Sequence, residues 1–310
     1  MTSFAFVFPG QGSQAIGMLN GFADNAAVKA TMAEASDILH FDLIKMIAEG
    51  PKEDLDLTTN TQPVMLACAV AFYRAWLAAG GQAPFIVAGH SLGEYSALVA
   101  AGALQFADAV PLVRFRAQAM QEAVPVGQGG MAAILGLSDE DVRASCLEAA
   151  DDQVVEAVNF NAPLQVVIAG HKAAVERACE IAKAKGAKRA LALPVSAPFH
   201  SSLLKPASDR LRDYLSGIEF SIPKINLVNN VDVAIVSDPA LIKDALVRQA
   251  ASPVRWVETV QKIAAAGAIR LIECGPGKVL SGLTKRIQSD LQADSVFDQA
   301  SLDATLETLK

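Results

Sequence analysis

Residues 89–93, Gly-His-Ser-Leu-Gly, contain the clearest candidate for a reactive side chain. An apolar stretch precedes them and a helix-forming segment follows, so Ser91 is expected on a sharp turn from a strand into a helix, with its hydroxyl exposed as a nucleophile. Gly89 and Gly93 lack the Cβ atoms that would clash in so tight a turn. The N–H of Leu92 would point toward an oxyanion forming beside Ser91. The alternative, a serine in an ordinary strand–helix turn, fits this context less well.

A nucleophilic serine needs a general base, and the sequence offers four histidines. His90 adjoins the serine in the chain, which is poor geometry for taking its proton. His40 lies between a helix and a loop, and His171 begins a helix. His200 stands where a predicted strand ends and a helix starts, and parallel sheets assemble their sites at strand ends. By itself His200 would be a surface-loop residue, but a serine in need of a base makes it our candidate.

Length and composition predict a well-packed globular protein with two subdomains, or with one large domain carrying an insertion. The chain has 310 residues, of which 52% are hydrophobic and 19% are charged, and its formal net charge is −7 at pH 7. A single core rarely grows to this length. The negative charge argues against nucleic acid as the main partner.

The cysteines and the N-terminal residues indicate a cytoplasmic location. The four cysteines are isolated, without a C-x-x-C pair, as is typical of reduced thiols (Cys68, Cys146, Cys179 and Cys274). The first residues have no basic region, and no apolar run approaches the length of a membrane span. We expect no signal peptide, no membrane association and no metal site.

Strands that alternate with helices predict an α/β fold with a mostly parallel sheet. Before residue 127 we expect a strand at Phe4–Phe8 and helices near Ala26–Ile47, Pro63–Ala79 and Asp108–Glu122, with Pro63 and Asp108 at helix starts. After residue 198 we expect a helix from about Leu203, a strand near Ile225–Asn229, helices at Pro239–Ala250 and Val254–Ala266, and a strand at Ala268–Cys274. Residues from about Ser289 carry no assignment.

The segment between these two parts has a different order of predicted strands and helices. It predicts strands at Met131–Leu137, Val154–Val158, Gln165–Ala169 and Arg189–Val195, a loop at Asn159–Pro163, and helices from Ser138 to Ala150 and from Lys172 to Lys185. The order β-α-β-β-α-β is the ferredoxin-like pattern. We therefore expect a ferredoxin-like small subdomain, residues 127–197, inserted into a large α/β-hydrolase-like subdomain formed by residues 1–126 and 198–310.

Several motifs now converge on one family. They are residues 10–14 (Gly-Gln-Gly-Ser-Gln), 89–94 (Gly-His-Ser-Leu-Gly-Glu), Arg116 and 199–201 (Phe-His-Ser), joined by 159–161 (Asn-Phe-Asn) and 247–249 (Val-Arg-Gln). Together they closely resemble the malonyl-CoA:acyl carrier protein transacylases of bacterial fatty acid synthesis. The resemblance runs from the first strand to residues 275–278 (Gly-Pro-Gly-Lys).

The resemblance implies a role for each matching position. Ser91 would be the nucleophile and His200 the base. Gln249 matches the residue whose backbone carbonyl orients the histidine. Gln11 and Leu92 match the two backbone N–H donors of the oxyanion hole.

Arg116 matches the arginine that holds the malonyl carboxylate, because a guanidinium fork donates two parallel hydrogen bonds to a carboxylate. Arg114 lies two residues away, so only one of the two can point inward from a helix. Phe199 looks like the malonyl-selective pattern of related acyltransferases. Two departures from the family, Leu164 and Leu204, do not touch this chemistry.

The resemblance also implies the partners. Malonyl-CoA would be the substrate, no cofactor would be held permanently, and an acidic acyl carrier protein would accept the acyl group. Two basic clusters could dock that protein, and we select Lys188 and Arg189 from the first and Lys285 and Arg286 from the second. Solvated helix ends are the plainer interpretation of any one of these residues. A monomer is expected.

Two other functions fit parts of the pattern. A serine esterase or thioesterase of the α/β-hydrolase class would share the Gly-x-Ser-x-Gly turn, but its histidine comes late in the chain after an acidic triad member. Here more than a hundred residues follow His200. A non-catalytic carrier-protein binder with a decayed site is the third possibility, although serine, histidine and arginine are all present.

Overall fold

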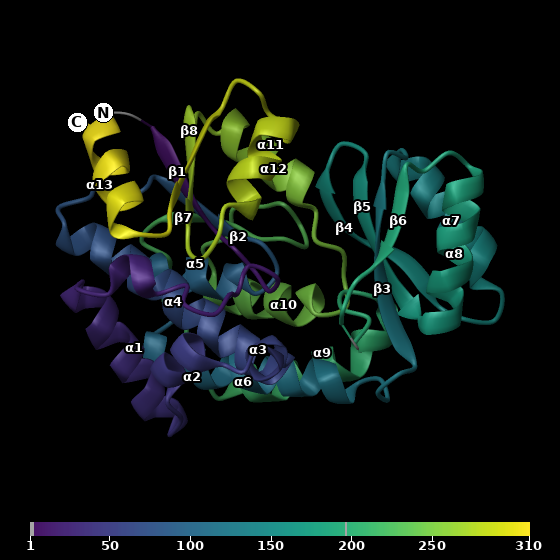
Figure 1. The fold of residues 1–310 in the computed structure, drawn as a ribbon, viewed down its shortest axis with the longest axis horizontal. Helices are drawn as coiled ribbons and strands as arrows, with labels where there is room; N and C mark the ends of the chain where they lie inside the picture. The colour runs from purple at the N-terminus through teal and green to yellow at the C-terminus, as the bar shows by residue number, and fades with distance from the viewer. Residues whose placement is uncertain (1–2, 196) are drawn as a thin grey trace.

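The fold is built on a five-stranded parallel sheet and a separate four-stranded antiparallel sheet. The computed structural model describes residues 3–195 and 197–310. The parallel sheet has the strand order β7-β2-β1-β8-β9. Its strands are β1 (Phe4–Phe8), β2 (Ile86–Gly89), β7 (Asn226–Val228), β8 (Arg270–Cys274) and β9 (Gln292–Val296). Figure 1 shows this sheet in the larger part of the molecule and the antiparallel sheet beside it.

Helices cover both faces of the parallel sheet, which is why its central strands read as continuous apolar runs. In β1, Phe4, Phe6 and Phe8 pack with α1 (Ala26–Leu39), α4 (Thr58–Ala78) and α6 (Phe106–Glu122). Ala5 and Val7 face the opposite way, toward α11 (Trp256–Ala265) and α12 (Val279–Ile287). The two-residue period of the strand thus separates two hydrophobic cores.

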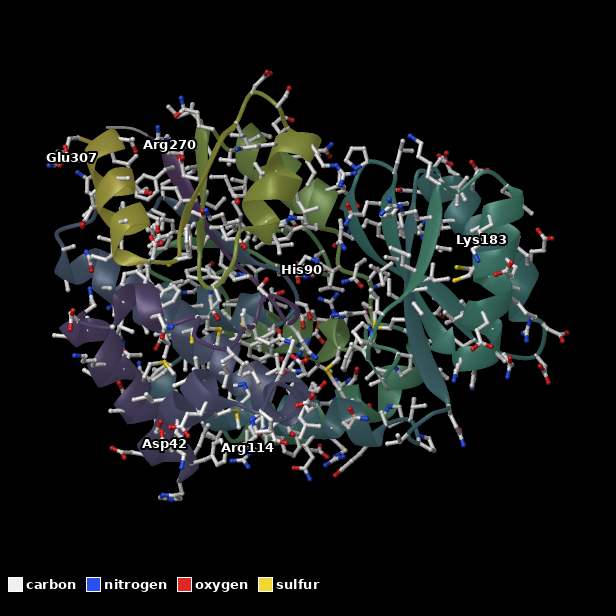
Figure 2. The ribbon with its side chains drawn as sticks, viewed as in Figure 1. Asp42, His90, Arg114, Lys183, Arg270 and Glu307 are labelled. Atoms are coloured by element: carbon white, nitrogen blue, oxygen red, sulfur yellow. The ribbon has the colours of Figure 1, made fainter. Side chains whose placement is uncertain are left out.

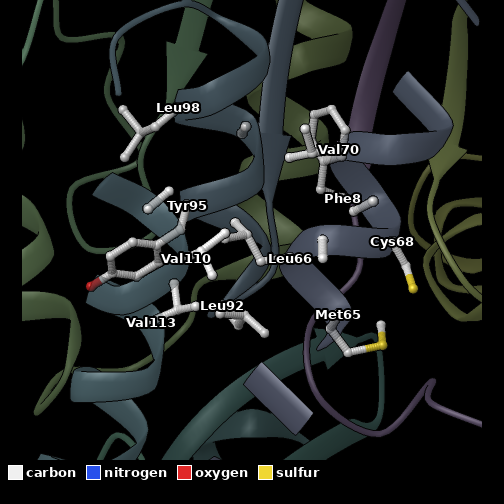
Figure 3. Packing of buried hydrophobic residues seen from close by; sticks show 14 of the residues in the cluster. Phe8, Met65, Leu66, Cys68, Val70, Leu92, Tyr95, Leu98, Val110 and Val113 are labelled. Atoms are coloured by element: carbon white, nitrogen blue, oxygen red, sulfur yellow. The ribbon is translucent and has the colours of Figure 1, made fainter. Parts of the chain in front are cut away.

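The helix that follows β2 is buried against its neighbours. In α5 (Gly93–Ala100) and the turn before it, Leu92, Tyr95 and Leu98 repeat every three residues and form one apolar face. Figure 3 shows this face close to Leu66 of α4 and Val110 of α6. This packing fixes the first turn of α5, where the expected nucleophile lies.

The antiparallel sheet has the strand order β4-β5-β3-β6. Its strands are β3 (Gly129–Leu135), β4 (Val155–Ala162), β5 (Gln165–His171) and β6 (Arg189–Ala192). Two helices, α7 (Asp139–Ala150) and α8 (Lys172–Ala184), cover its outer face (Figure 1). The Ser138 side chain accepts a hydrogen bond from the N–H of Asp141, as expected of the cap of α7.

Three predictions about helices before residue 127 were wrong. The predicted helix 26–47 is two helices, because His40 adopts a left-handed φ of 50° that ends α1 before α2 (Leu43–Glu49) begins. Pro63 lies inside α4, which starts at Thr58. Helix α6 starts at Phe106 with Gln105 at the cap position, so Asp108 lies in the first turn rather than at the cap.

Strand limits were also misplaced in the antiparallel sheet. Strand β3 begins two residues early and ends before Gly136, whose φ is 85°. Strand β4 continues to Ala162 with register shifts, so most of the predicted loop 159–163 is strand. Strand β6 ends at Ala192, because Pro194 cannot donate to a neighbouring strand.

The remaining elements complete the two layers around the parallel sheet. They are α3 (Lys52–Asp56), α9 (Lys205–Ser216), α10 (Pro239–Gln249), α13 (Gln299–Thr308) and two short 3₁₀ turns at Asn20–Phe22 and Ser202–Leu204. Strand β9 and helix α13 lie in the region that received no assignment. Among the described residues, no helix has both the length and the hydropathy needed to cross a bilayer.

Candidate active site

Ser91 lies on a strained turn between β2 and α5, where its φ is 52°. A Cβ atom on Gly89 would lie 1.8 Å from the backbone carbon of Gly93, and one on Gly93 would lie 2.0 Å from the carbonyl oxygen of Phe8. No side chain fits at either distance, so both positions require glycine. Ser91 is not glycine and pays conformational strain for its position, as residues at functional turns often do.

His200 is the histidine that the fold brings to this serine. Its Nε2 lies 2.7 Å from Ser91 Oγ, and its Nδ1 lies 2.9 Å from the backbone oxygen of Gln249. A carbonyl only accepts hydrogen bonds, so Nδ1 carries the proton and Nε2 is free to accept from the serine hydroxyl. This is the arrangement that a general base requires.

The other three histidines make different contacts. His90 Nε2 lies 2.8 Å from Asn161 Oδ1, and the Nδ1 of His171 accepts a hydrogen bond from the N–H of Val154. His40 ends α1. None of the three contacts the serine hydroxyl within the described part of the chain.

The environment of His200 keeps its imidazole neutral. The residue is 3% exposed. Burial, followed by the positive charge of Arg116, lowers the pKa of His200 to about 3, against the opposing hydrogen bond to the Gln249 carbonyl. A neutral imidazole at physiological pH can accept a proton.

Arg116 is buried at the same point, although it is an arginine in the middle of a helix. It is 1% exposed, and its guanidinium donates to Gln62 Oε1 at 2.8 Å, Gln249 Oε1 at 2.9 Å and Ser91 Oγ at 3.2 Å. Arg114 is exposed, and Figure 2 shows it at the edge of the molecule, far from the central His90. The expectation that only one of the two arginines points inward is confirmed.

The loop after β1 approaches the turn closely. A Cβ atom on Gly10 would lie 2.6 Å from the carbonyl oxygen of His90. This approach places Gln11 beside Ser91 and Leu92 on the wall of one cavity. In the part of the chain that the structure describes, the N–H groups of Gln11 and Leu92 donate to no protein acceptor. Two unpaired donors beside a nucleophile are what an oxyanion hole requires.

The cavity has a volume of about 480 Å³ and lies between the two sheets. Ser91, His200 and Arg116 line its floor, while Met131 of β3 and Leu283 of α12 are among its walls. This volume falls in the range of small-molecule sites. The described residues contain no group of three or more histidine, cysteine or acidic side chains that could hold a metal ion.

Sequence reasoning missed four contributors to the site: Gln62, Glu94, Asn230 and the side chain of Gln249. Each is at most 1% exposed and is hydrogen-bonded to Ser91, to Arg116 or to another of the four. One signal pointed to one of them: Asn230 follows a predicted buried strand, and parallel sheets assemble their sites at strand ends.

The four basic residues selected for docking are exposed. In the antiparallel sheet, Arg189 of β6 lies opposite Leu135 of β3. On the other side of β3, Leu135 lies opposite Gln165 of β5. Arg286 donates to the side chain of Gln165 and, at 3.2 Å, to the backbone oxygen of Pro163. Strands lie about 4.8 Å apart, so the Cα atoms of Arg189 and Gln165 are about 10 Å apart.

Gln165 also lines the cavity. The two basic clusters therefore meet at one end of the antiparallel sheet, beside the cavity.

Comparison with known proteins agrees with this geometry. A family model described as "Acyl transferase domain" matches residues 5–297. The chain belongs to this family and is an acyltransferase.

The names of individual relatives are more specific than the description of the family. The chain is 56% identical over 307 residues to the "Malonyl CoA-acyl carrier protein transacylase" of Salmonella typhimurium, with 99% of both chains covered. It is 44% identical to the protein of that name from Bacillus subtilis, over 100% of this chain and 98% of the relative.

Solved structures give the same result. The acyl-carrier-protein S-malonyltransferase of Burkholderia pseudomallei is 72% identical, with a TM-score of 0.97 over 99% of this chain and 100% of that one. A malonyl-transacylase solved in complex with a type II PKS acyl-carrier protein is 54% identical, with a TM-score of 0.98 over 99% of this chain and 100% of that one. The resemblance drawn from the sequence motifs is confirmed.

Proposed function

We propose that this enzyme transfers the malonyl group of malonyl-CoA to the phosphopantetheine thiol of acyl carrier protein, through a malonyl ester on Ser91. One observation carries the proposal: Ser91 Oγ lies within hydrogen-bond distance of both His200 Nε2, at 2.7 Å, and Arg116 Nη2, at 3.2 Å. A nucleophile, a base and a carboxylate-binding fork meet at one atom. That combination suits a short acyl group with a free carboxylate at its far end.

The first half-reaction forms the ester. Ser91 Oγ attacks the thioester carbonyl while His200 Nε2 takes the hydroxyl proton, and the N–H groups of Gln11 and Leu92 stabilise the oxyanion. The tetrahedral intermediate then collapses as the carbon–sulfur bond breaks. His200 returns its proton to the departing sulfur, which leaves as the thiol of coenzyme A.

The second half-reaction reverses these roles. The phosphopantetheine thiol gives its proton to His200 Nε2 and attacks the ester carbonyl. The bond to Ser91 Oγ breaks, and the serine oxygen takes the proton back from His200. Throughout, the Gln249 carbonyl holds the imidazole in the required tautomer, and Arg116 holds the malonyl carboxylate.

We further propose that the two sheets mark two subdomains: an α/β-hydrolase-like body of residues 1–126 and 198–310, and a ferredoxin-like insertion of residues 127–197. Lys188, Arg189, Lys285 and Arg286 would dock the acidic carrier protein across them, and their place beside the cavity supports this. The product would supply extender units for fatty acid synthesis. The cytoplasmic location and the monomeric state stay predictions.

Labelled malonyl-CoA distinguishes this function from its alternatives. The account predicts that label stays on the protein after removal of free coenzyme A, and that holo carrier protein then takes it up. Apo carrier protein, which lacks the phosphopantetheine thiol, is the matched control and should take up none. Release of the label as free malonate, at the rate of coenzyme A formation, would identify a hydrolase. Absence of any capture would identify a binding protein.

A further inference from the structure

A cluster of buried polar side chains lies directly behind Ser91. Glu94 comes from α5, Asn230 follows β7, and Gln249 ends α10, so three distant segments meet there. Their exposures are 1%, 0% and 0%. Buried polar groups are costly unless they are hydrogen-bonded, so a cluster in this position needs a reason.

Asn230 holds both sides of the turn that carries Ser91. Its Oδ1 accepts from the N–H of Ser91 at 2.7 Å, and its Nδ2 donates to the carbonyl oxygen of Gly89 at 2.7 Å. These two bonds close around a residue in a left-handed conformation. The asparagine side chain thus acts as a clamp on the strained turn.

Gln249 links the three groups of the proposed mechanism. Its backbone oxygen accepts from His200, and its Oε1 accepts from Arg116 Nη2 at 2.9 Å. Its Nε2 donates to the backbone oxygen of Ser91 at 3.0 Å and to Glu94 Oε2 at 2.8 Å. One amide therefore joins the serine, the guanidinium and a buried carboxylate.

Glu94 decides which way that amide points. Glu94 Oε2 accepts both hydrogen bonds that reach it, so Gln249 turns its NH₂ group toward Glu94 and its oxygen toward the donors of Arg116. The same Glu94 oxygen accepts from the backbone N–H of Asn230 at 3.0 Å. Glu94 thus sets the orientation of Gln249 and also anchors the clamp at Asn230.

Glu94 is also an acidic group that acts on the charge of Arg116. The three hydrogen-bond partners of the guanidinium are uncharged side chains, on Gln62, Ser91 and Gln249. Burial lowers the pKa of Arg116, and Tyr95 and, after it, the carboxylate of Glu94 oppose that fall.

We propose that Glu94 is a positioning residue that aligns Arg116 through the side-chain amide of Gln249, and Ser91 through Asn230. The inference rests on the proposed function, because Arg116 and Ser91 have their roles only there. It assigns a task to a buried acid that touches neither substrate nor the reacting atoms.

The test compares the specificity constants for malonyl-CoA and acetyl-CoA in five variants. Glu94→Ala removes the acceptor, and Gln249→Met removes the amide but keeps the backbone carbonyl. Both should lower kcat/KM for malonyl-CoA by about 10- to 100-fold, the range for one hydrogen bond to a charged group, and should lower it less for acetyl-CoA. Glu94→Gln keeps an acceptor for both N–H groups, so its loss should be only a few-fold.

Glu273→Ala is the matched control. Glu273 is a fully buried carboxylate of β8 that accepts from the backbone N–H of Ser281, far from this amide in the hydrogen-bond network. It should lower the melting temperature and leave the malonyl-to-acetyl ratio unchanged. The double variant of Glu94→Ala with Gln249→Met should lose less than the product of the two single losses, because the two changes share the contact between Glu94 and Gln249.

The outcomes separate this inference from the proposed function. If wild-type protein forms no malonyl ester at Ser91, the proposed function fails. If it forms the ester but Glu94→Ala or Gln249→Met keeps the wild-type malonyl-to-acetyl ratio, the positioning role is wrong. Should Glu94→Ala not fold, the ratio for Gln249→Met alone decides.

Discussion

The floor of the cavity and its rim are built in opposite ways. On the floor, Ser91, His200 and Arg116 are held by short hydrogen bonds to buried partners. What we call the rim is the basic end of the antiparallel sheet beside the cavity; there Lys188 and Arg189 are exposed, and no ion pair within the described residues involves them. A reacting centre needs fixed geometry, whereas a docking surface needs charge that can adapt to a partner. Substitutions on the floor should therefore change chemistry, and those on the rim should change association.

The largest effect is expected on the floor, from His200→Ala. The variant keeps Ser91 but lacks the group that takes its proton, so acylation should slow by about 10²- to 10⁴-fold. Rapid-quench measurement of ester formation from malonyl-CoA checks this. A loss of less than about tenfold would mean that another group serves as the base.

Arg116→Ala should cost about 10- to 100-fold in kcat/KM for malonyl-CoA, as one charge-assisted pair is lost, and less for acetyl-CoA. Arg116→Lys should rescue poorly because an ammonium lacks the planar fork. Equal losses with the two substrates would instead show that Arg116 serves the packing of the site.

The pH dependence separates a buried base from an ordinary one. Because burial and Arg116 lower the pKa of His200 to about 3, its neutral form persists well below pH 6.5. In Glu94→Gln the rate of acylation should therefore stay nearly level between pH 7.5 and pH 5.5, where a solvent-exposed histidine would lose about tenfold. Wild type should fall over this range only by the few-fold cost of a neutral Glu94.

Burial raises the pKa of Glu94 to about 7, so Glu94→Gln serves as the control that removes this second titration. A fall in rate centred near pH 6.5 in both proteins would contradict the assignment of His200.

The smallest effect is expected on the rim. Reversing Lys188 and Arg189 to glutamate should raise KM for carrier protein several-fold and weaken its salt dependence, since exposed pairs contribute about 0.2–1 kcal/mol each. Acylation by malonyl-CoA should not change. Lys183 and Lys185 are the matched control, because they pair with Glu180 and Glu148, and Figure 2 shows Lys183 on the helical side of the antiparallel sheet, away from His90. Equal effects of the two reversals would place the docking surface elsewhere.

Residues on the cavity floor could be predicted from the sequence where the pattern that marks them is local. The turn at Ser91 has its strand, its glycines and its helix within residues 86–100. The cluster of Glu94, Asn230 and Gln249 was missed, because its hydrogen bonds span 136 to 158 residues and no local pattern records them. Matching motifs suggested the backbone of Gln249, but nothing in the sequence distinguished the role of its side chain.

Some secondary-structure predictions were wrong or absent for comparable reasons. Strand β9 has the sequence Gln-Ala-Asp-Ser-Val at the sheet edge, and only Val296 is fully buried, so it offers no apolar run. The break after α1 depends on one histidine in a left-handed conformation, which few residues other than glycine adopt. Tertiary contacts, rather than intrinsic propensity, set these limits.

The most direct test of the account is to locate the malonyl group. Protein incubated with malonyl-CoA, quenched and digested, should carry one malonyl ester, on Ser91, and addition of holo carrier protein before the quench should remove it. Ser91→Ala should fold with an unchanged melting profile and take up nothing. A malonyl group on any other residue, or transfer that continues in Ser91→Ala, would contradict the central claim that Ser91 carries the acyl group.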